Sequence, residues 1–236
     1  MLRLIGVLLL VVSTSRAELP AAPPLTPLPL FTQAGPALAR GALVWLHGTY
    51  DKDAPGPPDP PELVGRMAGR VLDVFQFLRS RGNDPLVGSG EGLARGLAAL
   101  RAGGYRRIVV AGHSRGAWIA LTALAHPGLA DSIVAVSVAA HGTRPERQIQ
   151  ARADWQALWA SASAAPTRVV LVQLGDDPYD PDPHWQLDVA KAGAERAGLR
   201  LLPIFLPPVP RGHLGFYKSE FDETLGAVIA DFADPR

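Results

Sequence analysis

An apolar segment that ends in a serine flanked by glycines is the feature of this sequence that most restricts its fold. Residues 108–118 read Ile-Val-Val-Ala-Gly-His-Ser-Arg-Gly-Ala-Trp, and a further apolar stretch runs to residue 125. This order predicts a buried strand, a tight turn at Ser114 and a helix. Because Gly112 and Gly116 lack a Cβ, the serine between them can adopt a strained backbone conformation. Its hydroxyl then lies at the carboxyl end of a strand, where the N–H of Arg115 points at a reacting oxygen.

Apolar strands alternate with helical segments along the rest of the chain. Besides the strand that ends at the serine, we expect strands at residues 42–47, 70–78, 132–138, 168–174 and 200–205, and helices at residues 91–102, 145–163, 185–197 and 218–232. Continuous apolar runs are typical of parallel strands that are buried on both faces. The pattern therefore predicts an α/β fold, a doubly wound and mostly parallel sheet with helices on both faces. Such sheets bind ligands at the carboxyl ends of their strands.

Size and composition limit the classes of function. The chain has 236 residues, 47% of them hydrophobic, which suffices for one domain with a substantial core. Its net charge is +1, and removal of Arg3 and Arg16 with an N-terminal signal takes it to −1. Nothing in this balance favours nucleic acid or an anionic membrane as a partner. The absence of cysteine excludes a disulfide framework, thiolate catalysis and cysteine-ligated zinc.

The first residues have the pattern of a secretory signal. Arg3 precedes a short apolar stretch at residues 4–12, and Ser15 and Ala17 are small residues at the two positions that a signal peptidase reads. We expect residues 1–17 to be cleaved off as a signal peptide and the protein to be exported, to the periplasm or outside the cell. An uncleaved anchor is the alternative, although the apolar stretch is shorter than the roughly 20 residues that span a bilayer.

Two segments lie outside the regular alternation. Residues 18–39 contain six prolines, which favours an extended leader over sheet or helix and places the folded domain at residues 40–236. Residues 142–165 follow a strand and carry Trp155 and Trp159 one helical turn apart, so we expect a short cap region here. These tryptophans belong either to the core or to a surface over the pocket. A cap this short favours small or accessible substrates.

A nucleophilic serine needs a base, and the base needs an acceptor that holds it in the correct tautomer. His213 follows the last predicted strand, and Asp176, Asp177 and Asp180 follow the strand before it. The parallel sheet that we predict brings the ends of these strands to one edge. The chain therefore offers a serine, an acid and a histidine in that order.

These motifs resemble those of the α/β-hydrolase family. The similar segments are His47-Gly48 after an early strand, Gly112-His113-Ser114-Arg115-Gly116, Gly175-Asp176-Asp177-Pro178 after a late strand, and Gly212-His213 before the last helix, within residues 40–233. The resemblance implies that Ser114 is the nucleophile and His213 the general base and then the general acid. It implies an oxyanion hole formed by the backbone N–H groups of Thr49 and Arg115, and it implies no cofactor.

The resemblance indicates the catalytic acid less directly. The family often has two variable residues between the glycine and its aspartate, whereas here one residue separates Gly175 from Asp177. We take Asp177, which precedes a proline, as the acid, with Asp180 as the alternative and Asp176 after it. The same loop also reads as an ordinary turn. Together with His184 it has the ligand types of a divalent metal site, but its proline spacing argues against one and we expect no metal.

The functional interpretation is an exported serine esterase. Its substrate is a small molecule with an ester-type acyl bond, cleaved through a Ser-His-Asp triad and an acyl-enzyme intermediate. Amide or thioester cleavage with the same triad is one alternative, and a non-catalytic exported binding protein on a hydrolase scaffold is another. In the latter case Ser114 is only a turn residue and His213 a loop residue. The side chain of Arg115 forms a surface ion pair or meets a negatively charged substrate.

Overall fold

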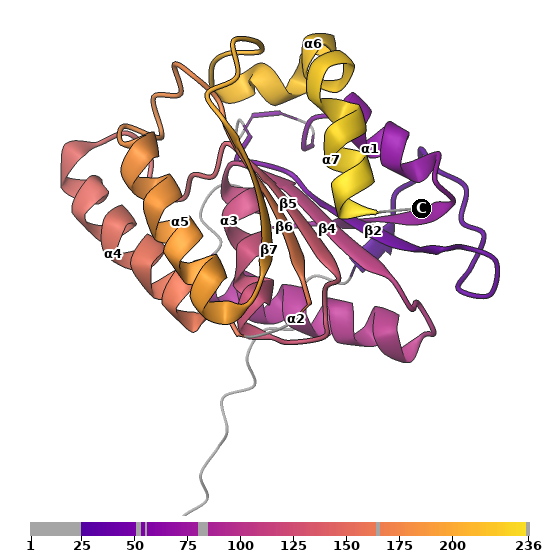
Figure 1. The fold of residues 1–236 in the computed structure, drawn as a ribbon. Helices are drawn as coiled ribbons and strands as arrows, with labels where there is room; N and C mark the ends of the chain where they lie inside the picture. The colour runs from indigo at the N-terminus through magenta and orange to yellow at the C-terminus, as the bar shows by residue number, and fades with distance from the viewer. Residues whose placement is uncertain (1–24, 51–52, 55, 80–84, 164–165, 235–236) are drawn as a thin grey trace, which may run out of the picture.

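A seven-stranded sheet forms the centre of the computed structural model, which describes residues 25–50, 53–54, 56–79, 85–163 and 166–234 (Figure 1). The strand order is β1-β3-β2-β4-β5-β6-β7, and every neighbouring pair except β1 with β3 is parallel. The strands are β1 (Leu25–Pro27), β2 (Gly41–Leu46), β3 (Leu72–Phe77), β4 (Ile108–His113), β5 (Ser132–Val136), β6 (Arg168–Gln173) and β7 (Arg200–Phe205). The predicted α/β fold with a mostly parallel sheet is confirmed.

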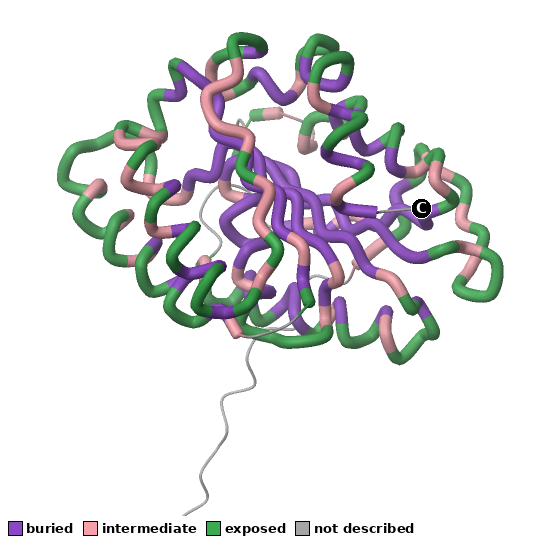
Figure 2. The backbone as a smooth tube through the Cα atoms, viewed as in Figure 1, coloured by how far each residue is buried: buried purple, intermediate pink, exposed green. Residues whose placement is uncertain are grey.

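Helices cover both faces of the sheet. α2 (Leu86–Ala102), α3 (Arg115–Thr122), α4 (Pro145–Ser161) and α5 (Pro183–Ala197) lie on one face, and α1 (Glu62–Ala68), α6 (Ser219–Phe221) and α7 (Ala227–Ala233) lie on the other (Figure 1). Each face has its own hydrophobic core, and the central strands are buried from end to end (Figure 2). This burial on both faces explains why these strands are continuous apolar runs. No helix in the described part of the chain is long and apolar enough to cross a membrane.

Three residues of the proline-rich leader form a strand of the sheet, which the sequence analysis did not predict. Residues Leu25–Pro27 form β1, which pairs antiparallel with the edge strand β3. Proline is tolerated there because an edge strand leaves one row of backbone donors unused. Further along, the N–H groups of Ala34 and Gly35 donate to the carboxylate of Asp73, at 2.6 and 2.8 Å. Residues 1–17, the predicted signal, lie outside the described residues.

Helix boundaries account for the other differences. The sequence analysis missed α1, a short helix that buries Leu63, Val64 and Met67, and it began α2 five residues too late. The predicted last helix is divided into α6, a π-helical turn at Asp222–Gly226 and α7. At this turn Asp222 pairs with Arg66 at 2.7 Å. A Cβ on Gly226 would come within 2.3 Å of the Asp222 carboxylate, so a larger residue there would displace the Asp222–Arg66 pair.

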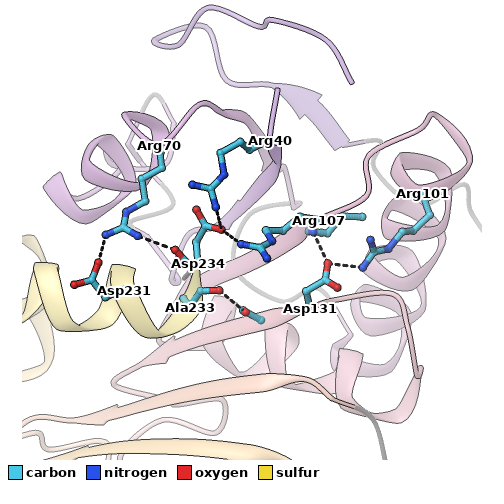
Figure 3. Close-up of polar contacts among 10 residues, drawn as sticks. Arg40, Arg70, Arg101, Arg107, Asp131, Asp231, Ala233 and Asp234 are labelled. Atoms are coloured by element: carbon cyan, nitrogen blue, oxygen red, sulfur yellow. Dashed lines mark hydrogen bonds and ion pairs between the residues drawn. The ribbon is translucent and has the colours of Figure 1, made fainter. Parts of the chain in front are cut away.

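A group of arginines holds the C-terminal segment at the amino ends of the strands (Figure 3). The fully buried carboxylate of Asp234 accepts hydrogen bonds from Arg40, at 3.2 Å, and from Arg107. Arg70 donates to the backbone carbonyl of the same residue at 2.7 Å and pairs with Asp231. We call Arg40, Arg70, Arg107 and Asp234 the C-terminal clamp. The clamp lies at the amino ends of the strands, whereas the candidate site residues lie at the opposite edge of the sheet, at the carboxyl ends.

Candidate active site

Ser114 occupies the junction between β4 and α3 in a strained backbone conformation. Its φ is 55° and its ψ is −121°, in a region that non-glycine residues rarely adopt. The residue before it ends β4 and the residue after it begins α3. The Ser114 N–H donates to the carbonyl of Val136 in the neighbouring strand at 3.0 Å, which holds the turn against the sheet. The serine is thus held at the carboxyl edge of the central strand.

The two glycines that flank this turn are required by backbone packing. A Cβ on Gly116 would lie 2.2 Å from the carbonyl oxygen of Leu46, and a Cβ on Gly112 would lie 2.6 Å from the carbonyl group of Gly116. Real Cβ atoms do not approach backbone atoms this closely. The start of α3 therefore packs directly on the end of β2, which brings the loop after β2 next to Ser114.

Ser114, His213 and Asp177 form one hydrogen-bonded chain. The Nε2 atom of His213 lies 2.9 Å from Ser114 Oγ, and its Nδ1 atom lies 2.9 and 3.0 Å from the two carboxylate oxygens of Asp177. The Asp177 side chain is only 3% exposed and that of His213 13%. A buried carboxylate at Nδ1 favours the tautomer with the proton on that nitrogen and leaves Nε2 free to accept a proton from the serine.

The other two aspartates of the loop face elsewhere. Asp176 has a φ of 60° and pairs with Arg211 at 2.5 Å, a hydrogen bond that lowers the pKa of its carboxyl group. The carboxylate of Asp180 accepts from the side-chain amide of Gln173 at 2.9 Å. Burial raises the pKa of Asp180 to about 6 against the opposing effect of that hydrogen bond. Of the three candidate acids, Asp177 is the one whose carboxylate contacts His213.

The loop after β2 approaches the serine from the other side. His47 Nδ1 lies 2.7 Å from the Gly48 carbonyl, so this histidine shapes the loop. Thr49 and Arg115 both line a cleft of about 450 Å³ together with Ser114 and His213. Arg115 is the first residue of α3, and N–H groups in the first turn of a helix have no partner within the helix. The start of α3 therefore adjoins this cleft beside Ser114.

Comparison with solved structures agrees with this architecture. No protein-family model matches the chain, and no curated protein matches it in sequence. An esterase from Thermogutta terrifontis superposes with a TM-score of 0.59 at 15% identity, over 87% of this chain and 88% of that one. A dienelactone hydrolase, described as putative, from Klebsiella pneumoniae superposes with a TM-score of 0.58 at 12% identity, over 87% and 90% of the two chains. A phospholipase/carboxylesterase from Dyadobacter fermentans gives 0.55 at 14% identity, over 88% and 98%.

The chain has the α/β-hydrolase fold. In this fold the segment that the sequence analysis expected to form a short cap contains α4, which packs against α5 in the helical layer on one face of the sheet. Trp155 and Trp159 are 1% exposed within the core, so they do not cover the cleft. The His141 side chain is only 10% exposed, and its Nε2 atom lies 3.0 Å from Asp154. Among the described residues no cluster of His, Asp and Glu side chains is arranged to hold a metal ion.

Two aromatic neighbours of His213 were not predicted as site residues. His113 donates from Nε2 to the backbone carbonyl of His213 at 2.8 Å. Burial lowers the pKa of His113 to about 4, so its ring is neutral at pH 7. The ring of Tyr179 lies 4.2 Å from that of His213, centroid to centroid. The backbone N–H of Tyr179 donates to the Asp177 carboxylate at 2.9 Å. The only sequence signal for either residue is its position beside a motif.

Proposed function

We propose that this protein is a serine hydrolase that cleaves ester bonds through Ser114, His213 and Asp177. The observation that carries the proposal is the hydrogen-bonded chain from the serine hydroxyl through the imidazole to a buried carboxylate. A strained serine at a strand–helix junction and a cleft beside it add support. Esterases and hydrolases share its fold, which supports acyl transfer as the reaction class. The residues of the site, and not the fold, carry the assignment of the mechanism.

In the proposed reaction, His213 accepts the proton of Ser114 as Oγ attacks the ester carbonyl carbon. The tetrahedral oxyanion accepts hydrogen bonds from the backbone N–H groups of Thr49 and Arg115. His213 then donates its proton to the departing alcohol, and the acyl group stays on Ser114. Water, deprotonated by the same imidazole, releases the acid and restores the serine. Asp177 stabilises the imidazolium of His213 that forms during both acylation and deacylation.

Labelling with a fluorophosphonate probe tests this proposal. Such a probe reacts with an activated serine, so the wild-type protein should be labelled and Ser114→Ala should not. His213→Ala should be labelled much more slowly, and a series of p-nitrophenyl esters should show a turnover number at least roughly 10³-fold lower in either variant. A correctly folded wild-type protein that is not labelled would contradict the proposal and favour a binding protein on the same scaffold.

We also propose that the protein is exported after cleavage behind Ala17. The pattern of Arg3, the apolar residues 4–12 and the small residues near position 17 supports this. Determination of the N-terminal sequence of the protein expressed with its full leader tests it. A mature chain that starts at residue 18 is expected, whereas an intact Met1 in the exported fraction would indicate an anchor.

A further inference from the structure

The ring of Tyr179 packs against the imidazole of His213, the base of the proposed reaction. The centroids of the two rings lie 4.2 Å apart, and their planes are inclined by 40°. Tyr179 is 37% exposed, lines the same cleft as Ser114 and belongs to neither hydrophobic core. The contact therefore lies at the cleft, beside the atoms that react, and a change of this side chain leaves both cores intact.

Hydrogen bonds fix the backbone on both sides of Tyr179. Its N–H donates to Asp177 Oδ1 at 2.9 Å, and the N–H of Asp180 donates to the carbonyl of Asp177 at 3.1 Å. The Asp180 carboxylate in turn accepts from the side-chain amide of Gln173, at the end of β6, at 2.9 Å. The loop that presents the ring to His213 is therefore already ordered, so the contact costs little conformational entropy.

A hydrogen bond at one ring nitrogen does not by itself fix a histidine. Asp177 holds Nδ1 of His213, at 2.9 and 3.0 Å from its carboxylate oxygens, but the imidazole can still tilt about that nitrogen. In the free protein the hydrogen bond between Ser114 Oγ and Nε2, at 2.9 Å, limits this tilt. In the proposed acyl-enzyme Oγ carries the acyl group and has no proton to donate, so Nε2 loses this partner. The ring contact with Tyr179 remains, and it limits the tilt while water enters.

The proposed reaction also places a positive charge on His213. An aromatic ring attracts a cation that lies within about 6 Å of its centroid, and the ring of Tyr179 meets this condition. The imidazole of His113, at 4.9 Å, is neutral at pH 7 because burial lowers its pKa to about 4. It therefore adds no second charge beside His213. The ring of Tyr179 adds to the stabilisation of the imidazolium that Asp177 provides.

We propose that Tyr179 is a positioning residue, whose ring holds the His213 imidazole in place and stabilises its imidazolium, most of all during deacylation. The inference rests on the proposed function and adds to it a residue outside the triad. Tyr179 forms no bond and transfers no proton, because the proton still moves between Ser114 or water, His213 and the departing alcohol. Removal of the ring should therefore slow both halves of the reaction, and deacylation more than acylation.

Two measurements separate the two halves. The rate of labelling by a fluorophosphonate reports attack by Ser114, before any acyl-enzyme exists. The turnover number with p-nitrophenyl acetate reports deacylation, because an activated ester acylates the serine quickly, and a burst of p-nitrophenol in the first turnover verifies this. Tyr179→Leu should lower the labelling rate about threefold, as expected for the loss of a partly exposed cation–π contact. It should lower the turnover number about tenfold, since a loosened imidazole also misplaces the attacking water.

Further replacements of Tyr179 show whether the ring is responsible. Tyr179→Phe keeps the ring, and no described residue hydrogen bonds to the Tyr179 hydroxyl, so both rates should stay within about twofold of the wild type. Tyr179→Met is a second non-aromatic replacement and should behave as Tyr179→Leu does. Thermal melts should be similar for all three variants, because the side chain is partly exposed. A residue that only stabilised the fold would not divide aromatic from non-aromatic replacements in this way.

Phe205→Leu is the matched control. Phe205 packs its ring against His184, with the centroids 4.7 Å apart, and neither residue lines the cleft. The same type of substitution thus removes an aromatic ring from a histidine that takes no part in the proposed reaction. Both the labelling rate and the turnover number should stay within about twofold of the wild type.

The positioning role and the proposed function fail in different ways. If the wild-type protein is labelled and hydrolyses the ester, but Tyr179→Leu keeps both rates, the positioning role is wrong and the hydrolase remains. Equal losses in Tyr179→Phe and Tyr179→Leu also overturn it, because the hydroxyl and not the ring would then be responsible. A higher KM with unchanged rates would show that the ring only contacts the substrate. If the wild-type protein is neither labelled nor active, the proposed function fails, and a positioning role without a reaction fails with it.

Discussion

The buried guanidinium of Arg79 donates a hydrogen bond to the backbone carbonyl of His47. The same Nη2 atom lies 3.2 Å from the next carbonyl, that of Gly48. Arg79 follows the end of β3 and is only 7% exposed, whereas His47 follows the end of β2. A cation at this place orders two successive peptide groups immediately before Thr49. It therefore sets the direction of the N–H group that we propose as an oxyanion donor.

Arg79→Gln should lower kcat more than it changes KM. Loss of a whole oxyanion donor costs about 10²–10³ in turnover, so a donor that is displaced but still present should cost roughly tenfold. Steady-state kinetics on a neutral p-nitrophenyl ester measures the effect, and the labelling rate with the fluorophosphonate should fall in parallel. Arg79→Lys is the matched variant, because it keeps the charge and should recover part of kcat. A variant that melts at a lower temperature with normal kcat would show that Arg79 only stabilises the fold.

The roles of Asp177 and Asp180 can be distinguished by replacing each of them with asparagine. Asp177→Asn should reduce kcat by about 10³–10⁴, because a neutral amide neither stabilises the imidazolium nor favours the required tautomer of His213. Asp180→Asn should keep kcat within about twofold, since Asp180 contacts Gln173 instead. Equal losses in the two variants would contradict the assignment of the acid.

The pKa of Asp180 makes Asp180→Asn a well-folded control. Its folded-state pKa of about 6 is above the ordinary value of 3.8, so the folded protein binds this proton more tightly than the unfolded chain. The contribution of Asp180 to stability is therefore present below about pH 4 and is lost as the pH rises to about 6. At pH 7 the amide avoids the cost of the buried charge. Thermal melts should show a variant at least as stable as the wild type.

His113 should make the protein less stable in mild acid. Its folded-state pKa is about 4, below the ordinary value of 6.5, so between these values the unfolded chain binds a proton that the folded protein does not. The free energy of unfolding should therefore fall as the pH decreases from about 6.5 to about 4, by up to about 3 kcal/mol. Urea unfolding at a series of pH values, compared with His113→Gln, isolates this contribution. The variant should show a flatter dependence, and identical slopes would exclude His113 as the cause.

The C-terminal clamp should contribute strongly to stability. Asp234→Asn leaves Arg40 and Arg107 facing a neutral side chain at a fully buried position, and we expect a loss of about 3 kcal/mol in the free energy of unfolding. Asp231→Asn is the matched control, because Asp231 is 69% exposed where it pairs with Arg70. It should cost less than about 1 kcal/mol. Similar losses in both variants, measured by urea unfolding, would mean that burial of Asp234 has no special effect.

Local patterns in the sequence were sufficient for most of the fold. The apolar run at residues 200–205 coincides with β7, and the strand that ends at Ser114 coincides with β4. The sequence was insufficient for α1, because a seven-residue segment after a proline-rich loop is too short to show a helical pattern of apolar residues. It was also insufficient for β1, since prolines argue against a strand unless an edge is known to be free beside it.

Within the candidate site, the sequence determined which residue types follow which strands. A serine, an acidic loop and a histidine, which follow the parallel strands β4, β6 and β7, had to meet at one edge of the sheet, because parallel strands end on the same side. Only the tertiary structure decided that Asp177 faces His213 while Asp176 turns to Arg211 and Asp180 to Gln173. Neighbouring carboxylates in a loop are locally equivalent, and their partners lie more than thirty residues away or in another element.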